Sequence, residues 1–234
     1  MVERRPRTRT TYHHGDLRAA LIEAGTNLAR DGGPQAIVLR EVTRIVGVAP
    51  NSAYGHFSTL PALKTAVSEN ARGVMGEAME TRIDAAAATE PEHTTEAAKR
   101  YLREVGRAYV RFALAEPGLF RTAMGGDPTG LRVPGAFRDA PTTTDDNKPL
   151  PKLFLLRALT RLVDAGCLRQ GELAKAVTAS WATVHGLSIM LLDLLPPTAP
   201  EEADEVIDDA LNVLVAGLTA AGGKEVPSHV VGHR

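Results

Sequence analysis

Side chains suited to catalysis are few in this sequence, and their spacing does not bring them together. The one cysteine, Cys167, has no recognisable base beside it in the sequence to form the thiolate that thiol chemistry needs. His229 and His233 stand four residues apart near the end of the chain, without an evident third metal ligand. A G-x-S-x-G elbow, a phosphate-binding P-loop and a G-x-G-x-x-G segment after a strand are absent from the sequence. We therefore expect no enzymatic activity, no metal and no cofactor.

The basic side chains are distributed in a way that favours nucleic-acid binding. The whole chain has a net charge of −1, but residues 1–60 carry +3 and residues 61–234 carry −4. Four arginines fall within the first nine residues: Arg4, Arg5, Arg7 and Arg9. A short basic arm of this kind can reach DNA phosphates. Charge alone also allows a solvated terminus with no partner, so the arm needs support from the rest of the sequence.

Length, cysteine content and hydropathy restrict the class of protein. The 234 residues suit one or two domains, and a single cysteine cannot close an intramolecular disulfide. The longest apolar run, residues 187–195, is interrupted by Asp193 and stops before Pro196, which is short of a membrane span. The first residues lack the apolar stretch of a signal peptide. We expect a cytoplasmic protein without a membrane partner.

Apolar residues recur with helical spacing along most of the chain, which predicts an all-α fold. The first helix carries Leu17, Leu21 and Leu28 on one face behind a cap at Asp16. Residues 125–148, rich in Gly, Pro, Thr and Asp, predict a long loop, and no stretch shows the period-two pattern of a strand. The helices are expected at residues 16–32, 39–46, 50–57, 61–88, 94–116, 118–124, 151–165, 172–195 and 200–221.

The second and third of these segments have the pattern of a helix-turn-helix. Residues 38–57 read VLREVTRIVGVAPNSAYGHF, in which Gly47 permits a sharp turn and Val48 can fill the space between the helices. In such a motif the second helix lies in the major groove. The small and polar residues that begin the second helix suit close approach to base edges. By pattern alone, a tight turn in an ordinary helical bundle remains an alternative.

Specific residues carry a resemblance to a known family. Residues 12–67 resemble the N-terminal DNA-binding domain of TetR-family transcriptional regulators, most closely at Gly47-Val48 and in the run Tyr54-Gly55-His56-Phe57. Far along the chain, Trp181, His185 and Gly186 look like the WHG-type C-terminal domain of part of this family. The resemblance implies a three-helix DNA-binding domain at the N-terminus. It also implies a C-terminal helical domain for ligand binding and dimerisation.

The same resemblance implies roles for residues of the helix-turn-helix. Arg40, Tyr54 and His56 would contact the DNA backbone, and residues at the start of the recognition helix would face the bases: Pro50, Asn51, Ser52 and Ala53. The family usually has a lysine where this chain has Leu60, so one phosphate contact is missing. The arginine arm can supply comparable charge. Phe57 is expected in the core, and Tyr54 is expected to pack its ring and turn its hydroxyl outward.

The C-terminal half contains bulky and polar residues on inner helix faces, which are candidates for a ligand pocket: Tyr109, Phe112, Phe120, Met124, Phe154, Trp181 and His185. Trp181 and His185 stand four apart and so share a helix face. Each of these residues can also simply fill the core, and His185 can tie two helices together instead of contacting a ligand. Because aromatic residues make up only 4% of the chain, we expect a small aliphatic pocket.

The last two helices are the expected dimer interface, through apolar residues on their edges: Leu191, Leu195, Ile207, Leu211, Leu214 and Leu218. The domains are expected at residues 1–15 (arm), 16–60 (DNA-binding), 61–223 (regulatory) and 224–234 (tail). Together these observations predict a dimeric repressor that binds a palindromic DNA site and is released by a small molecule. An activator of the same fold, or a helical small-molecule-binding protein without DNA function, is the alternative.

Overall fold

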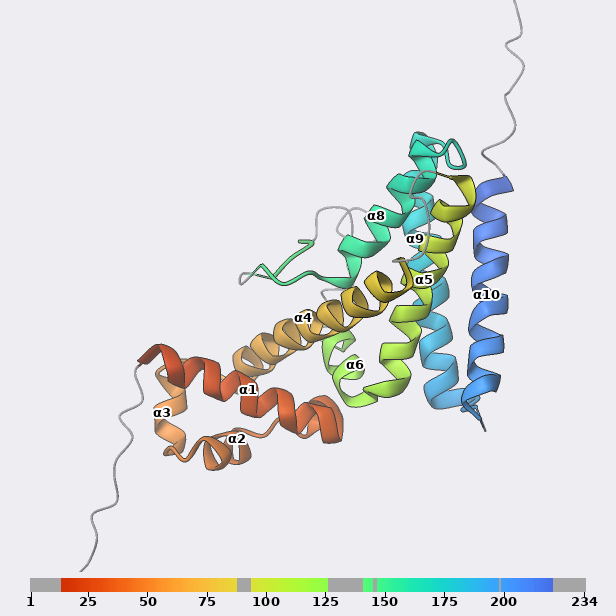
Figure 1. Ribbon diagram of the computed structural model, residues 1–234. Coiled ribbons are helices and arrows are strands. Elements are labelled where there is room, and N and C mark those ends of the chain that lie inside the picture. The colour runs from red at the N-terminus through yellow and green to blue at the C-terminus, as the bar shows by residue number, and fades with distance from the viewer. Residues whose placement is uncertain (1–13, 88–93, 126–140, 145–146, 198, 221–234) are drawn as a thin grey trace, which may run out of the picture.

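A computed structural model describes residues 14–87, 94–125, 141–144, 147–197 and 199–220, and these residues form an all-α fold (Figure 1). The described part of the chain contains no β-strand, only an isolated bridge between Thr143 and Pro149. The helices are α1 (His14–Gly32), α2 (Leu39–Val46), α3 (Pro50–Tyr54), α4 (Leu60–Ala87), α5 (Thr95–Ala115), α6 (Pro117–Met124), α8 (Pro151–Asp164), α9 (Leu173–Ile189) and α10 (Pro200–Ala220). Short 3-10 turns cover Gly33–Gln35 and Gln170–Glu172, and a π-helical turn covers Met190–Leu194.

The chain has two parts joined by one long helix, as Figure 1 shows. The head consists of α1, α2 and α3, and the body consists of α5 to α10. Helix α4 has 28 residues and so extends about 42 Å. It packs against α1 in the head and against α5, α6 and α8 in the body. A change in the body can therefore reach the head through one continuous element.

Local sequence signals account for most helix ends. The Thr94 hydroxyl accepts a hydrogen bond from the Ala97 amide at 3.1 Å and caps α5, close to the predicted start of this helix. Pro117 and Pro151 occupy the first turns of α6 and α8, where a missing N–H has no cost. The third helix is shorter than predicted and ends at Tyr54. The amide of Phe57 then bonds to the Ala53 carbonyl and turns the chain toward the core.

Part of the predicted loop at 125–148 is described, and it packs on α4. The Leu150 amide bonds to Thr142 O at 2.8 Å, and the Lys148 ammonium lies 3.3 Å from the Glu77 carboxylate on α4. At Gly76 the backbone of this segment comes so close that a Cβ would lie 1.8 Å from the Pro149 carbonyl oxygen. Glycine at this position is therefore required for the contact between α4 and the segment before α8.

The segment Gln170–Leu194 is long and apolar enough to cross a membrane, judged by length and composition alone. A search for uninterrupted apolar residues misses this segment because Asp193 ends the longest run. In the fold, however, α9 packs against α5, α8 and α10. A third of its most apolar stretch is buried in the body, and the exposed remainder includes Asp193 and Leu194 as well as small residues of α9.

Candidate functional site

The turn of the helix-turn-helix has the geometry that its sequence predicts. Gly47 ends α2 with φ of 77°, in the left-handed region that favours glycine. The next amide, of Val48, bonds to the Thr43 carbonyl at 3.0 Å. Pro50 then occupies the first turn of α3. Backbone hydrogen bonds therefore close the end of α2, and α3 begins three residues after the turn glycine.

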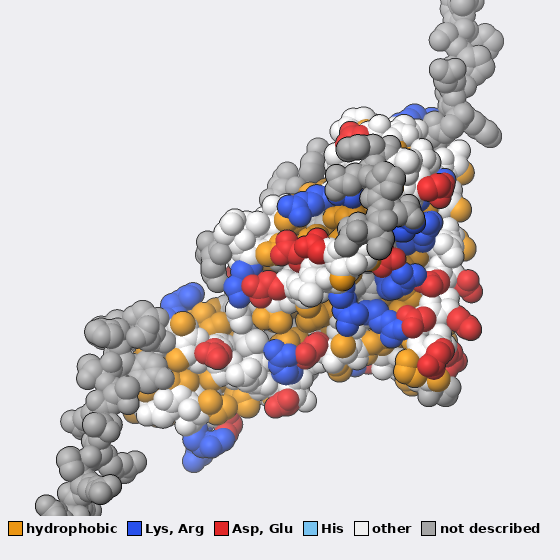
Figure 2. Space-filling model, in the orientation of Figure 1, with side chains coloured by type: hydrophobic (Ala, Val, Ile, Leu, Met, Phe, Trp, Pro, Cys, Tyr) orange, Lys and Arg blue, Asp and Glu red, His pale blue; other side chains and the backbone are white. Residues whose placement is uncertain are grey.

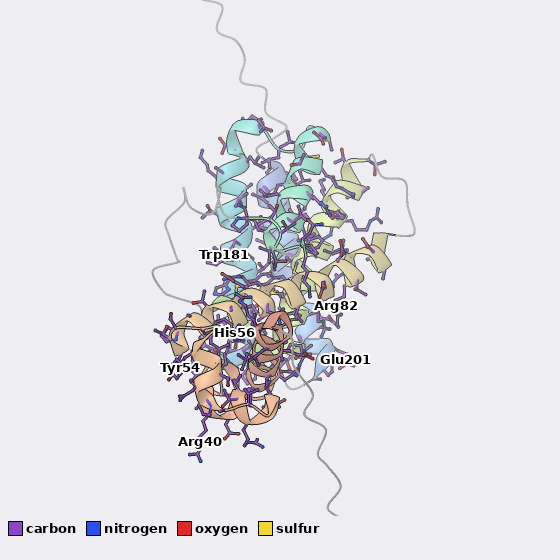
Figure 3. The ribbon with its side chains drawn as sticks, turned by 90° about the vertical axis from the view of Figure 1, so that its left-hand side faces the viewer. Arg40, Tyr54, His56, Arg82, Trp181 and Glu201 are labelled. Carbon is purple, nitrogen blue, oxygen red and sulfur yellow. The ribbon has the colours of Figure 1, made fainter. Side chains whose placement is uncertain are left out.

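Several of the predicted DNA contacts lie together on the surface of the head. Pro50, Asn51, Ser52 and Tyr54 are exposed on α3, and Arg40 is exposed on α2. Tyr54 is 54% exposed, so its ring as well as its hydroxyl is accessible. Figure 3 shows Arg40 at the tip of the head, with its side chain directed away from the body. These residues make one exposed row of polar and small side chains.

Other predicted contacts are placed differently. Ala53 is completely buried, which corrects the expectation that it faces the bases; its methyl group fills the core of the head. His56 is half-buried beside the turn that follows α3. Phe57 is buried as expected, with the Arg18 guanidinium 5.3 Å from the ring centroid. The arginine arm, Arg4 to Arg9, lies outside the described residues, as do His229 and His233.

The head also exposes residues that the sequence reasoning did not single out. Arg44 is exposed on α2 one turn after Arg40, and its guanidinium pairs with the Glu41 carboxylate at 2.8 Å. Val38 and Ile45 are the exposed apolar residues of the same region. The spacing of Arg40 and Arg44, four residues apart, already places both on one helix face. That signal would have identified Arg44 from the sequence.

In the body, residues from three helices meet at the hydroxyl of Tyr109. This hydroxyl lies 3.1 Å from His185 Nδ1 on α9 and donates toward Met124 Sδ on α6 at 3.5 Å. Trp181, one turn before His185, also hydrogen-bonds the Tyr109 side chain. We call Tyr109, Phe120, Met124, Trp181 and His185 the body cluster. Its members belong to the residues predicted for a ligand pocket.

The rings of the body cluster pack closely. The His185 ring stacks on Trp181 with centroids 5.0 Å apart and planes inclined by 13°. Phe120 lies 5.7 Å from His185 and meets Tyr109 edge-on at 5.8 Å. The surroundings of His185 are therefore aromatic, which corrects the expectation of an aliphatic pocket. A low aromatic content of the whole chain does not exclude a local group of rings such as this one.

Burial keeps the two titratable groups of the body cluster uncharged. Tyr109 is 5% exposed, and this burial raises the pKa of its hydroxyl well above the ordinary value, although the Trp181 hydrogen bond opposes the rise. Burial likewise lowers the pKa of His185. No charged side chain among the described residues contributes to either pKa. At neutral pH the cluster is electrically neutral.

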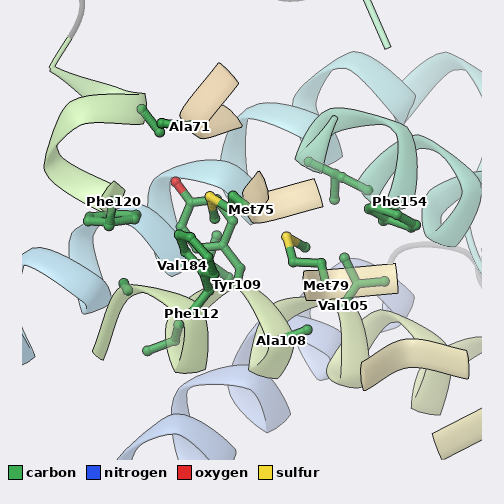
Figure 4. Close-up of a cluster of buried hydrophobic side chains, with 14 of the residues drawn as sticks. Ala71, Met75, Met79, Val105, Ala108, Tyr109, Phe112, Phe120, Phe154 and Val184 are labelled. Carbon is green, nitrogen blue, oxygen red and sulfur yellow. The ribbon is translucent and has the colours of Figure 1, made fainter. Parts of the chain in front are cut away.

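The two remaining pocket candidates, Phe112 and Phe154, are core residues, and the described contacts give neither of them a polar partner in the cluster. Phe112 and Phe154 are both almost completely buried. Figure 4 shows Phe154 well separated from Tyr109, on α8, whereas Phe112 and Val184 lie close to Tyr109. The Arg157 guanidinium lies 5.9 Å from the Phe154 ring centroid. The structure thus brings together five of the seven candidates around one hydroxyl.

The predicted interface residues on the last two helices divide into two groups. Leu191, Ile207 and Leu211 are buried in the subunit's own core, which corrects their assignment to an interface between subunits. Leu195 is exposed, and Leu214 and Leu218 are half-buried. The opposite face of these helices exposes Val213 and Leu194. A Cβ added at Gly186 or Gly217 would meet open space.

Salt bridges fix α10 against α5 on the other side. Arg107 pairs with Asp208, and Arg111 pairs with Asp204. Figure 2 shows basic and acidic side chains interleaved on this face of the body, with acidic side chains on its outer edge over α10. On the solvent side of α10, Asp209 lies one turn before Val213 and both are exposed, so this face combines apolar and acidic side chains.

The head and the body meet directly at the first turn of α6. A Cβ at Gly118 would lie 2.3 Å from the carbonyl oxygens of Ala29 and Arg30, which belong to the last turn of α1. Beside this contact, the Arg30 guanidinium pairs with the Glu116 carboxylate at 2.5 Å. Phe120 and Met124 follow on the same short helix. One helix therefore touches both the end of α1 and the body cluster.

Comparison with known protein families gives one match, which covers the C-terminal half. Residues 102–214 match the family described as "Tetracyclin repressor-like, C-terminal domain". The matched range includes Trp181, His185 and Gly186. Among curated protein sequences, none matches this chain at a significant level.

Several solved structures share the fold across almost the whole chain. A protein of unknown function from Rhodococcus sp. RHA1 is 23% identical, with a TM-score of 0.62 over 90% of this chain and 100% of that one. A TetR variant from Acinetobacter baumannii AYE in complex with minocycline is 18% identical, with a TM-score of 0.56 over 92% and 100%. RolR in complex with resorcinol is 18% identical, with a TM-score of 0.52 over 91% and 96%. These likenesses establish the fold.

Proposed function

We propose that the chain is a TetR-family transcriptional regulator, and specifically a dimeric repressor that binds a palindromic DNA site and leaves it when a small molecule binds the body. Regulators of this family are not enzymes. Their fold supports ligand-responsive control of transcription. The repressor role, the palindromic site and the dimer are proposed beyond what the likeness to known families supports.

The observation that carries DNA binding is the exposed row on the head. Asn51 and Ser52 open a helix whose other face is held by Ala53 and Phe57, so the two polar side chains are presented outward on a fixed scaffold. Asn51 can pair with adenine in the major groove. Arg40 and Tyr54 are also exposed on the head and suit phosphate contacts. Without an arginine at the base-facing positions, DNA shape carries part of the specificity.

Dimerisation through α9 and α10 is supported by the apolar and small residues that the subunit leaves exposed on these two segments. Val213 and Leu194 are 75% and 71% exposed, and glycines at 186 and 217 leave room for another helix to approach closely. Two copies of this face would form a four-helix interface with two-fold symmetry. Such symmetry places two α3 helices on related half-sites, which is why we expect a palindrome.

Release by a small molecule is supported by the position of α6. A ligand at the body cluster would displace Phe120 or Met124, and the same helix contacts α1 through Gly118. The known complexes of the TetR variant with minocycline and of RolR with resorcinol support a small-molecule effector here. The ligand must bind the released state more tightly than the DNA-bound state to shift the equilibrium.

Selection of bound sequences from a random duplex library tests the proposal. We expect the full chain to enrich a palindrome, and Tyr54→Ala to enrich nothing at the same protein concentration. Enrichment of a sequence without two-fold symmetry would contradict the dimeric mode of binding. A chain that folds but enriches no duplex would instead be a helical small-molecule-binding protein. Transcription assays with the selected site distinguish a repressor from an activator of the same fold.

A further inference from the structure

The body cluster contains a polar group that the fold leaves unused. His185 Nδ1 faces the Tyr109 hydroxyl, but no residue in the described part of the chain hydrogen-bonds the other ring nitrogen, Nε2. The Tyr109 hydroxyl can donate to Nδ1, which leaves Nε2 as a donor. Alternatively, Nδ1 can donate to the hydroxyl, which leaves Nε2 as an acceptor. This nitrogen can therefore serve either a donor or an acceptor on a ligand.

A second unused polar group lies on the same helix. The hydroxyl of Ser180 is almost completely buried and has no hydrogen-bond partner. Ser180 stands one turn before Val184 on the inner face of α9, and Figure 4 shows Val184 next to Tyr109. Buried hydroxyls are normally paired, so the Ser180 hydroxyl, like that of Ser68 on α4, is a buried polar group whose partner the described residues do not supply.

The surroundings of these groups contain rings and thioethers but no charge. Phe120 and Trp181 flank His185, and the sulfur of Met124 approaches Tyr109. Aromatic faces and flexible thioethers favour contact with a flat ring. The nearest ion pair on α6, between Arg121 and Asp193, is at the surface and is neutralised within itself. An ionic ligand in this cluster would lose its hydration without gaining a counter-charge.

We propose that the effector is an uncharged molecule with an aromatic ring and at least one hydroxyl or carbonyl oxygen, held in the body cluster by hydrogen bonds to His185 Nε2 and the Tyr109 hydroxyl. The proposal rests on the proposed function only in calling the ligand an effector. It excludes organic anions and cations of similar size. It assigns Tyr109 and His185 to ligand binding, in addition to their structural role of joining α5 to α9.

Four small probes that share one ring separate charge from hydrogen bonding: benzyl alcohol, benzoate, benzylamine and toluene. At neutral pH benzoate is an anion and benzylamine is a cation, whereas toluene lacks a polar atom. Trp181 is the single tryptophan of the chain and stacks on His185, so its fluorescence reports directly on the site. Probes of this size reach millimolar dissociation constants in suitable sites.

We expect benzyl alcohol to change Trp181 fluorescence with a saturable curve, and both ionic probes to bind at least about tenfold more weakly. Tyr109→Phe should weaken the binding of benzyl alcohol by about tenfold while leaving the binding of toluene unchanged. The control is Tyr101→Phe on the same helix, because Tyr101 packs its ring under Arg161 at 3.9 Å, away from the cluster. This control should leave all four curves unchanged.

Binding of benzoate or benzylamine as tightly as benzyl alcohol would overturn the proposal. A chain whose fluorescence responds saturably to none of the probes would also overturn it. These outcomes are distinct from failure of the proposed function. If benzyl alcohol binds as expected but no duplex is enriched, the proposed ligand class is supported and the proposed function as a DNA-binding regulator is contradicted. If a duplex is enriched and an ionic probe releases the protein from it, the proposed regulator function is supported and the proposed ligand class is contradicted.

Discussion

Tyr54 in the head and Tyr109 in the body are the same type of residue in opposite surroundings. Tyr54 is 54% exposed on the five-residue helix α3, whereas Tyr109 is 5% exposed between α5, α6 and α9. The head holds its functional side chains outward on a small core, and the body holds its polar groups inside a large one. The difference indicates that substitutions in the head should change DNA binding without changing the stability of the fold. Substitutions in the body should change ligand binding and stability together.

The largest expected effect is the loss of a ring from the body. Phe120→Ala removes a completely buried ring that contacts Tyr109 and His185. We expect the free energy of unfolding to fall by about 3–5 kcal/mol. Urea denaturation followed by circular dichroism measures it. Tyr54→Ala is the matched control in the head and should change stability by less than about 0.5 kcal/mol. Equal losses of unfolding free energy in the two variants would contradict the idea that the polar side chains of the head can be changed without loss of stability.

The junction between the regions should come next. Gly118→Val places a branched side chain against the Ala29 and Arg30 carbonyls, where even a Cβ is too close. We expect a loss of about 1–3 kcal/mol and an unfolding transition in which head and body separate. Gly171→Val is the control, because a Cβ there meets nothing. A Gly118→Val variant that unfolds as cooperatively as the wild type would contradict direct coupling through α6.

The recognition residues should affect specificity more than stability. Asn51→Ala removes an exposed amide from α3. We expect the discrimination at one base-pair position to fall by about 1–3 kcal/mol, measured by competition between the selected duplex and single-base variants. Stability should be unchanged because the side chain is exposed. Undiminished discrimination at every position would mean that α3 reads the site through other residues or through DNA shape.

The smallest expected effect is a pH dependence that comes from the body. Burial lowers the pKa of His185 in the folded chain, so below about pH 6.5 the unfolded chain takes up a proton that the folded chain resists. Stability should therefore fall as the pH drops through this range, and by less in His185→Gln. Urea midpoints at pH 8 and at about pH 5.5 measure the difference. Identical pH profiles would show that His185 titrates equally in both states.

Helix boundaries in this protein could be predicted from the sequence because they are set locally. Thr94 caps α5, Pro117 and Pro151 begin their helices, and Gly47 ends α2. Each signal acts within one turn of the chain. The end of α3 could not be predicted in this way. Its early stop at Tyr54 depends on the burial of Phe57 against the rest of the head.

Faces of helices were harder to assign than their ends. Helix α10 has two apolar faces, and periodicity alone cannot tell which one meets α5. The structure packs Leu211 against Gly106 and leaves Val213 exposed, so half of the predicted interface residues lie in the core. The same problem affects Ala53, since a small residue suits either a base edge or a helix contact. For the body cluster, spacing predicted only the pairing of Trp181 with His185, because Tyr109 and Met124 come from other helices.

Our central claim is that the exposed row of the head binds DNA, whereas the polar groups of the body cluster bind a ligand. The most direct test is the dissociation constant of the selected duplex for the wild type, Tyr54→Ala and Tyr109→Phe, at one salt concentration and without ligand. We predict that Tyr54→Ala weakens binding at least about tenfold and that Tyr109→Phe leaves it within about twofold. Equal affinities for wild type and Tyr54→Ala, or a loss confined to Tyr109→Phe, would contradict the claim.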